Sequence, residues 1–270
     1  MTAVAAYGRA TLAVFMRDLL TFASYRGRLP GQLLGVAATV SLFYYVSRLV
    51  STPQFPTPED YFSFALVGIV VVRAMALSFG GLVGGVRQEL VAGTFERMVT
   101  SPLGPTLGLA AMTLFPLVLS FFLGMATIAF AVVVFGVSLE WATVPLALPA
   151  GILAALTLVP FCLMISAAVV AFKQAAGAVR LFAIIITVVS GLLFPVSLLP
   201  AWISWMSDVQ PFTPMVELLR HLLIATPLED PVALTVVKVL AFLLVLLPPA
   251  VIALHLAIAR SQRRATLIEY

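Results

Sequence analysis

Six long apolar stretches, separated by short polar connectors, constrain the fold of this chain more than any other feature. Hydrophobic residues make up 62% of the 270 residues and charged residues only 10%, which is more hydrocarbon than a soluble domain can bury. A helix that crosses a membrane needs about 20 mostly apolar residues. We therefore predict an all-α membrane protein with six transmembrane helices, at residues 29–50, 61–86, 106–135, 143–172, 181–199 and 235–259.

The whole chain, residues 1–270, is predicted to form a single membrane domain, because no internal repeat or polar linker divides it. Residues 1–28 precede the spans at 29–259, and residues 260–270 follow them as a cytoplasmic tail. In the first segment apolar residues recur at helical spacing: Leu12, Phe15, Met16, Leu19 and Leu20. This pattern predicts an amphipathic helix at the cytoplasmic membrane interface. A cytosolic helix that packs on a partner is the alternative.

The charges indicate an orientation, because basic residues near the ends of spans collect on the cytoplasmic side. With the N-terminus inside, 11 of the 15 Lys and Arg residues fall in cytoplasmic segments, and only Arg48, Arg220 and Lys238 lie on or near the outer side. Seven of the 11 acidic residues lie outside. Both termini are therefore predicted to be cytoplasmic, in a multi-pass protein of the cell (inner) membrane that contacts membrane lipid.

Aromatic residues support this topology, because tryptophan favours the headgroup level of a bilayer. All three tryptophans fall at the predicted outer interface: Trp141, Trp202 and Trp205. The segment 200–231 contains two of them, five prolines and apolar pieces too short to cross. Non-helical backbone at membrane depth survives only where protein or water satisfies it. We therefore predict short re-entrant helices in the outer leaflet, between the fifth and sixth spans.

Several function classes are disfavoured by what the sequence lacks. The basic residues are scattered over four cytoplasmic segments rather than gathered in one stripe, so no nucleic-acid partner is predicted. The single cysteine, Cys162, has no second cysteine to pair with. His221 and His255 form no metal-ligand set, and no polar set is placed for catalysis. We expect neither a metal site nor a catalytic site in this chain.

The connector between the second and third spans, residues 87–103, contains a candidate docking helix. Four of its residues are spaced to share one helix face: Leu90, Thr94, Arg97 and Met98. Glu89 and Glu96 offer carboxylates, and Pro102 would end the helix. On periodicity alone, a docking helix and a solvated connector fit this segment equally well.

Two blocks of sequence resemble one known family. The run Glu89-x-x-x-Gly93-Thr94-Phe95-Glu96-x-Met98-x-x-Ser101-Pro102 resembles the cytoplasmic loop of ABC-2 family permeases, the membrane subunits of ABC exporters. The blocks 191–202 and 210–220 are similar to that family's fifth span and outer re-entrant element. Phe95 stands where Leu is usual, and Phe212-Thr213-Pro214 where Asn-Pro-hydrophobic-Thr is commoner. With the six spans, the resemblance covers nearly the whole chain.

The resemblance implies a partner that hydrolyses ATP. It places a coupling helix, which docks on a separate ATPase, at Glu89, Gly93, Thr94, Phe95, Glu96, Arg97 and Met98. The residues agree, because neither Lys173 nor Lys238 follows a glycine-rich loop after a strand, so no phosphate-binding loop is present. ATP and Mg²⁺ would be bound by the partner. The resemblance also implies two permease copies, most simply a homodimer, with two ATP-binding subunits.

Four polar residues are candidates for the pathway or its gate. Arg73 lies near the middle of the second span, where a cation must face protein, water or an opposite charge. It would line the pathway and bind an anionic headgroup, or pair with a carbonyl group or Glu217, or reach water at the interface. Glu217, Arg220 and His221 are spaced to share a helix face. They would form a polar gate at the outer mouth, or structural pairs.

These observations predict the permease subunit of an ATP-driven exporter, which moves an amphipathic or lipid-like substrate such as a drug or small lipophile outward. Export of a lipid-linked polysaccharide or glycolipid is the alternative within the family. An ion-gradient-driven secondary carrier is the alternative from another class. Such carriers place ionisable groups at the membrane midplane, where this chain has Arg73 and no carboxylate.

Overall fold

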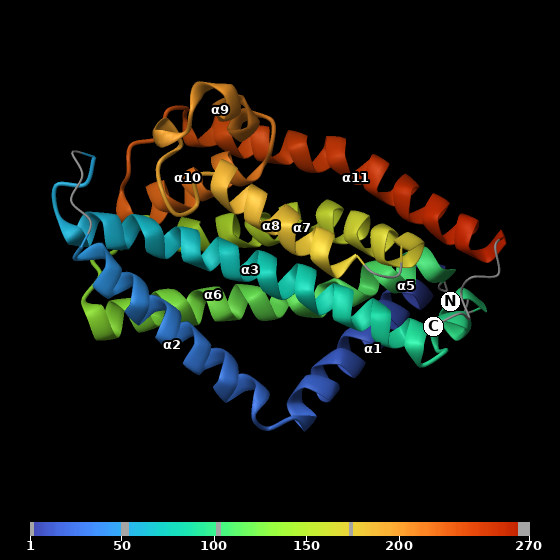
Figure 1. Cartoon of the computed structure of the whole chain (residues 1–270). Helices are drawn as coiled ribbons and strands as arrows, with labels where there is room; N and C mark the ends of the chain where they lie inside the picture. The colour runs from blue at the N-terminus through green and yellow to red at the C-terminus, as the bar shows by residue number, and fades with distance from the viewer. Residues whose placement is uncertain (1–2, 50–53, 101–103, 173–174, 264–270) are drawn as a thin grey trace.

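A computed structural model describes residues 3–49, 54–100, 104–172 and 175–263, and the regular elements in these ranges are all helical. In chain order they are α1 (Ala3–Ser24), α2 (Arg28–Ser47), α3 (Pro58–Val91), α4 (Phe95–Thr100), α5 (Gly104–Met112), α6 (Leu114–Phe135), α7 (Val144–Phe172), α8 (Ala176–Val189), the 3-10 turn η1 (Val196–Leu198), α9 (Ala201–Asp208), α10 (Phe212–Ile224) and α11 (Val232–Arg263). Figure 1 shows the long helices running side by side as one bundle.

Five helical segments are long and apolar enough to cross a membrane: α2, α3, α5 with α6, α7 and α11. α3 and α7 are central, because 50% of the residues in their most apolar stretches are buried, against 11% in α2 and α11. The peripheral helices therefore expose most of their apolar surface, which is stable against hydrocarbon or another apolar protein surface but not against water. The prediction of an all-α membrane protein is confirmed.

The predicted fifth span, residues 181–199, differs from the structure. α8 begins earlier, at Ala176, and ends at Val189 after 14 residues. Its length is therefore about 21 Å, short of a hydrocarbon core of about 30 Å. Gly191 adopts a left-handed backbone conformation, with φ of 63°, which favours glycine and stops the helix. The predicted span thus contains a helix end in its middle, at Ser190 and Gly191 and ahead of Pro195.

The predicted third span, residues 106–135, is interrupted once. α5 ends at Met112 and α6 begins at Leu114. Pro116 lies in the first turn of α6, where the lack of an N–H group is tolerated because N–H groups of the first turn have no acceptor within their own helix. The Thr113 hydroxyl donates to the Ala110 carbonyl oxygen at 2.7 Å. Two helices with a shared direction therefore replace one continuous span.

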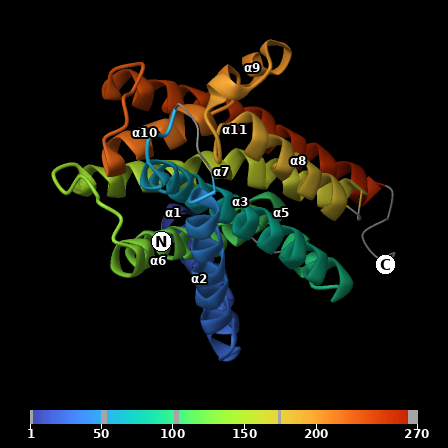
Figure 2. The same cartoon turned by 60° about the vertical axis from the view of Figure 1, so that its left-hand side comes forward.

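α1 and α2 form an open V, whose connecting turn projects away from the other helices in both views (Figure 1, Figure 2). The rings of Phe15 and Phe22 on α1 lie 6.0 and 5.5 Å from the ring of Phe115 on α6. Leu12 and Leu20 remain 52% and 65% exposed. The N-terminal helix thus keeps an uncovered apolar face, and its position at the membrane surface stays a prediction.

The proline-rich segment after α8 forms two short helices. α9 stands at the edge of the bundle in Figure 2, with Trp202 and Trp205 exposed. α10 is instead a core helix, in contact with α3, α7 and α11. Its residues Met215, Val216 and Leu218 have no exposed surface (0%). The sequence predicted the short helices but not that one of them would be enclosed by the long ones.

Candidate functional site

The connector after α3 is not one continuous helix. α3 continues to Val91, so Glu89 lies in its last turn, and α4 begins only at Phe95. Gly93, with φ of 68°, turns the chain between the two helices. The prediction of a single helix face through Leu90, Thr94, Arg97 and Met98 is therefore wrong. Ser101 and Pro102 of the family-like motif lie outside the described residues.

Two of the predicted coupling residues hold α4 against the rest of the chain. Phe95 is only 1% exposed and belongs to the same buried cluster as Leu109. The Met98 side chain lies so close to Gly108 of α5 that a Cβ there would be 2.6 Å from it. Gly93 and Arg97 are exposed. A protein that docks on α4 would meet these two residues rather than Phe95.

Glu89 joins three segments of the chain. Its Oε1 atom accepts a hydrogen bond from Arg17 Nη1 of α1 at 2.6 Å, and its Oε2 atom accepts one from the Thr94 hydroxyl. Arg17 also pairs with Asp18 at 2.9 Å. Burial raises the pKa of the Asp18 carboxyl, and the charge of Arg17 acts in the opposite direction. This Arg17–Glu89–Thr94 contact thus connects α1 with the turn between α3 and α4.

A groove of about 780 Å³ lies beside this contact, bordered by α1, the start of α2, α3, α5 and α6. Gly80 and Gly84 of α3 form part of its apolar wall, and a Cβ at either would meet no described residue outside its own stretch of α3 within 4 Å. Small residues four positions apart allow another helix to approach closely, but in this chain the surface over Gly80 and Gly84 is left open to the groove. The polar side chains at the groove include Arg17, Arg28, Gln32 and Gln88. The groove therefore has both an apolar and a polar side.

Arg73 of α3 donates hydrogen bonds to carbonyl and hydroxyl oxygens of α2. Its Nη1 atom lies 3.0 Å from the Gly35 carbonyl oxygen and 3.2 Å from the Thr39 hydroxyl, and Nη2 lies 3.4 Å from the Gln32 carbonyl oxygen. Among the alternatives raised by the sequence, this geometry favours pairing with carbonyl groups over pairing with Glu217. The arginine therefore connects the first two spans.

We expect Arg73→Met to lower the free energy of unfolding by about 1–3 kcal/mol, because carbonyl groups of α2 lose a charged donor. Arg73→Lys should retain part of the stability. The measurement is a denaturant titration of the purified chain in micelles. Arg26→Met, on the exposed turn between α1 and α2, is the matched control. Equal stability of the two methionine variants would contradict the role given to Arg73.

Arg220 of α10 is only 4% exposed. Its Nε atom donates to the Phe64 carbonyl oxygen of α3 at 3.2 Å, and Nη2 donates to those of Gly191 and Leu192 at 3.0 and 2.7 Å. The guanidinium carbon lies 3.4 Å from the centre of the Phe64 ring. Arg220 therefore satisfies the backbone just after α8 ends, and it connects three elements.

For Glu217, Arg220 and His221 the sequence left a polar gate and structural pairs open, and Arg220 and His221 have separate hydrogen-bond partners. Within the described part of the chain, Glu217 forms no ion pair with either neighbour. His221 Nδ1 lies 2.8 Å from the Thr226 carbonyl oxygen. Each basic residue instead contacts backbone. The three residues whose carbonyl groups accept from Arg220 have no polar side chains, so spacing in the sequence could not indicate them.

A family model described as ABC-2 type transporter matches residues 10–224. A comparison with curated proteins found no match. The matched region includes the Arg17–Glu89–Thr94 contact, the groove and all of α10. Membership accounts for the apolar helices, and it favours an ABC permease over an ion-gradient-driven carrier. The chain therefore belongs to the ABC-2 type transporter family, as a multi-pass membrane transport component without an ATPase of its own, in a family that works with an ABC ATP-binding subunit.

Proposed function

We propose that this chain is the permease of an exporter that moves amphipathic or lipid-like molecules, such as a drug or small lipophile, outward across the cytoplasmic membrane. The observation that carries the proposal is the Arg17–Glu89–Thr94 contact. Because this contact joins α1 to the turn between α3 and α4, a movement of α4 would also move α1 and α3. An ATP-binding subunit seated on α4 would drive this movement.

The groove beside Arg17 supports the substrate class. An amphipathic molecule has an apolar part that would contact the α3 wall and a polar part that would contact Arg28, Gln32 or Gln88. The volume of the groove, about 780 Å³, lies within the range of about 300–1,000 Å³ that is usual for small-molecule sites. Outward direction rests on the resemblance of the connector and the outer element to those of exporters.

We further infer six crossings, with α8 and residues 190–199 as the fifth. Irregular backbone is tolerated at membrane depth where protein satisfies it, and Arg220 does so for Gly191 and Leu192. An even number of crossings places both chain termini on the same side of the membrane. This agrees with the contacts that the terminal helices α1 and α11 both make with α5 (Figure 1). The distribution of basic residues favours the cytoplasm as that side.

The complex is proposed to contain two copies of this chain and two ATP-binding subunits, which hold the ATP and Mg²⁺. A single copy leaves the groove open on one side and Gly80 and Gly84 uncovered. A second permease placed against this side would close a path between the copies. Cross-linking of the purified complex would measure the number of copies.

Coupling is tested by removing the negative charge from the Glu89 acceptor of the Arg17 bond. Glu89→Gln should lower substrate-stimulated ATP hydrolysis about tenfold, if the charge of this bond contributes about 1.4 kcal/mol to the coupled state. Arg17→Met should have a similar effect, and the double variant should be no worse than Arg17→Met alone, because both substitutions act on the same contact. The assay uses the permease reconstituted with its ATP-binding subunit.

Glu59→Gln is the matched control for Glu89→Gln. Its pair with Arg48 is on the surface, with the two side chains 63% and 50% exposed, and such pairs contribute little. It should keep normal coupling. Normal coupling in Glu89→Gln, or losses that multiply in the double variant, would contradict the proposed role of the contact.

A further inference from the structure

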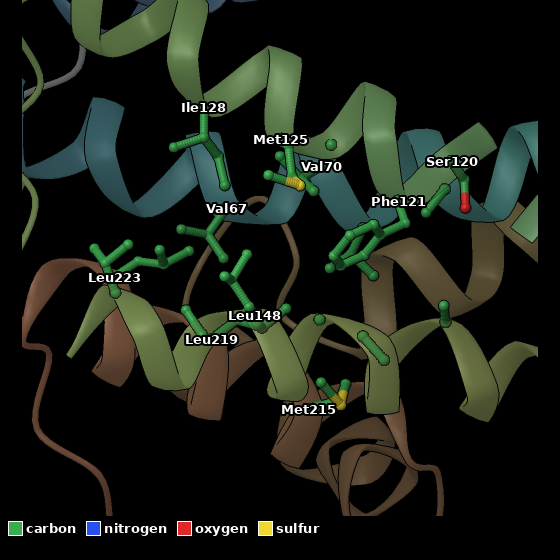
Figure 3. A pocket seen from close by; sticks show the side chains of 18 of the residues that line it. Val67, Val70, Ser120, Phe121, Met125, Ile128, Leu148, Met215, Leu219 and Leu223 are labelled. Carbon is green, nitrogen blue, oxygen red and sulfur yellow. The ribbon is translucent and has the colours of Figure 1, made fainter. Parts of the chain in front are cut away.

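A second cavity, of about 430 Å³, lies among α3, α6, α7 and α10. In Figure 3, Val67 of α3 and Ile128 of α6 face Leu148 of α7 and Leu219 of α10. Among the described residues, its lining includes no charged side chain. Its two hydroxyl groups are already used within their own helices: Ser120 donates to the Leu117 carbonyl oxygen at 2.8 Å and Thr157 to that of Ala154 at 2.7 Å. The cavity is therefore suited to hydrocarbon.

The cavity is elongated along the helices. α7 lines it from Val144 to Leu158, a rise of about 21 Å, which exceeds half of a hydrocarbon core of about 30 Å. Met125 and Leu148 at its rim are 42% and 44% exposed, so it opens toward the surrounding lipid. Trp141 also lines the cavity and is 67% exposed. The dimensions and the opening fit a chain that enters from the bilayer.

We propose that one acyl chain of a bilayer phospholipid occupies this cavity, with its headgroup end beside Trp141. An empty apolar cavity forfeits dispersion contacts and does not retain water, whereas lipid chains surround its open side. Tryptophan favours the headgroup level, which fixes the direction of the chain. The bound hydrocarbon fills the space between α6 and α7 and completes the packing of α10. This site is distinct from the groove beside Arg17 and from the proposed export.

Photolabelling tests the proposal. The chain is placed in vesicles of palmitoyl-oleoyl-phosphatidylcholine with a small fraction of the same lipid carrying a diazirine in one acyl chain, irradiated and digested for mass spectrometry. Leu219 and Leu223 of α10 are only 6% and 5% exposed, so bulk lipid does not reach them. We expect label on α10 as well as on Ile152, which is 52% exposed on α7 and does not line the cavity.

Two substitutions of the same kind separate the cavity from the lipid-facing surface. Ala154→Phe fills the cavity and should lose the label on α10 while keeping that on Ile152. Ala171→Phe, at an exposed position of α7 outside the cavity, should keep both labels. Met125→Trp narrows the open rim and should also lose the label on α10. It provides a second variant in case Ala154→Phe fails to elute as a single species on gel filtration.

Absence of label on α10 in the wild-type chain, with Ile152 labelled, would overturn the proposal. Undiminished label on α10 in a folded Ala154→Phe or Met125→Trp variant would overturn it as well. No ATP-binding subunit enters this assay, so no ATP-driven transport takes place in it. Its outcome is therefore independent of whether the proposed export is correct.

Discussion

Arg220→Leu is expected to lower the free energy of unfolding by about 3 kcal/mol or more, because hydrogen bonds to charged groups contribute about 1.5–3 kcal/mol each. The substitution removes the donor from the carbonyl groups of Gly191 and Leu192, at the point where α8 has ended. Surrounding hydrocarbon offers no replacement donor. Denaturant titration of the purified chain in micelles, followed on gel filtration, would measure the loss.

Arg48→Leu is the matched control, because the same change is made at an exposed arginine. Arg48 is paired with Glu59 at 3.2 Å on the surface, where ion pairs contribute about 0–1 kcal/mol. Arg220→Lys should be intermediate at best, since one ammonium group cannot replace the forked donors of a guanidinium. If Arg220→Leu is as stable as Arg48→Leu, Arg220 does not hold the end of α8 in the protein.

Three arginines join neighbouring helices to α3. Arg17 connects α1 with the end of α3, Arg73 connects α3 with α2, and Arg220 connects α10 and the residues after α8 with α3. The hydrophobic effect does little to hold helices together in lipid, so polar contacts and close packing matter more. α3 is also the longest helix, at 34 residues. It is therefore the element through which movement at α4 would reach the rest of the bundle.

The sequence predicts the long helices well, because a run of about 20 apolar residues has few stable structures other than a membrane-spanning helix. The start of α3 also has a local signal in the sequence, although the predicted span began three residues later, at residue 61. Thr57 accepts a hydrogen bond from the Asp60 N–H group and Asp60 accepts one from the Thr57 N–H group, a capping box written in the local sequence. The end of α8 was missed because the predicted span was drawn through Ser190, Gly191 and Pro195 on the strength of the apolar residues on either side.

The candidate site was predicted less well, because its contacts join residues far apart in the sequence. Arg17 and Glu89 are 72 positions apart, and no periodic pattern relates them. Phe95 fits a family-like docking motif, yet it is buried in the chain's own core. A sequence motif can identify a functional segment, but it does not show whether an apolar residue in that segment contacts a partner or packs inside the chain itself. Only the packing of α4 on α5 distinguishes these cases.

Gly68→Ala is expected to disrupt the same junction as Arg220→Leu, although it adds one methyl group. A Cβ at residue 68 would lie 1.5 Å from the Leu192 carbonyl oxygen and 3.2 Å from Arg220 Nη2. No side-chain rotation relieves this overlap, because both the Cβ and the carbonyl group are fixed by backbone. α3 and the residues after α8 must separate, which breaks the bonds of Arg220. We expect a loss of about 3 kcal/mol or more, at the upper end of overpacking effects.

Gly84→Ala makes the same chemical change on the same helix with the opposite expected result. Apart from its own stretch of α3, none of the described residues lies within 4 Å of a Cβ at residue 84, and alanine favours a helix over glycine by about 1 kcal/mol. Its free energy of unfolding should be unchanged or higher in the same titration. If Gly68→Ala and Gly84→Ala have similar free energies of unfolding, Leu192 does not approach α3 this closely. That result would also contradict the role of Arg220 as the donor at this junction.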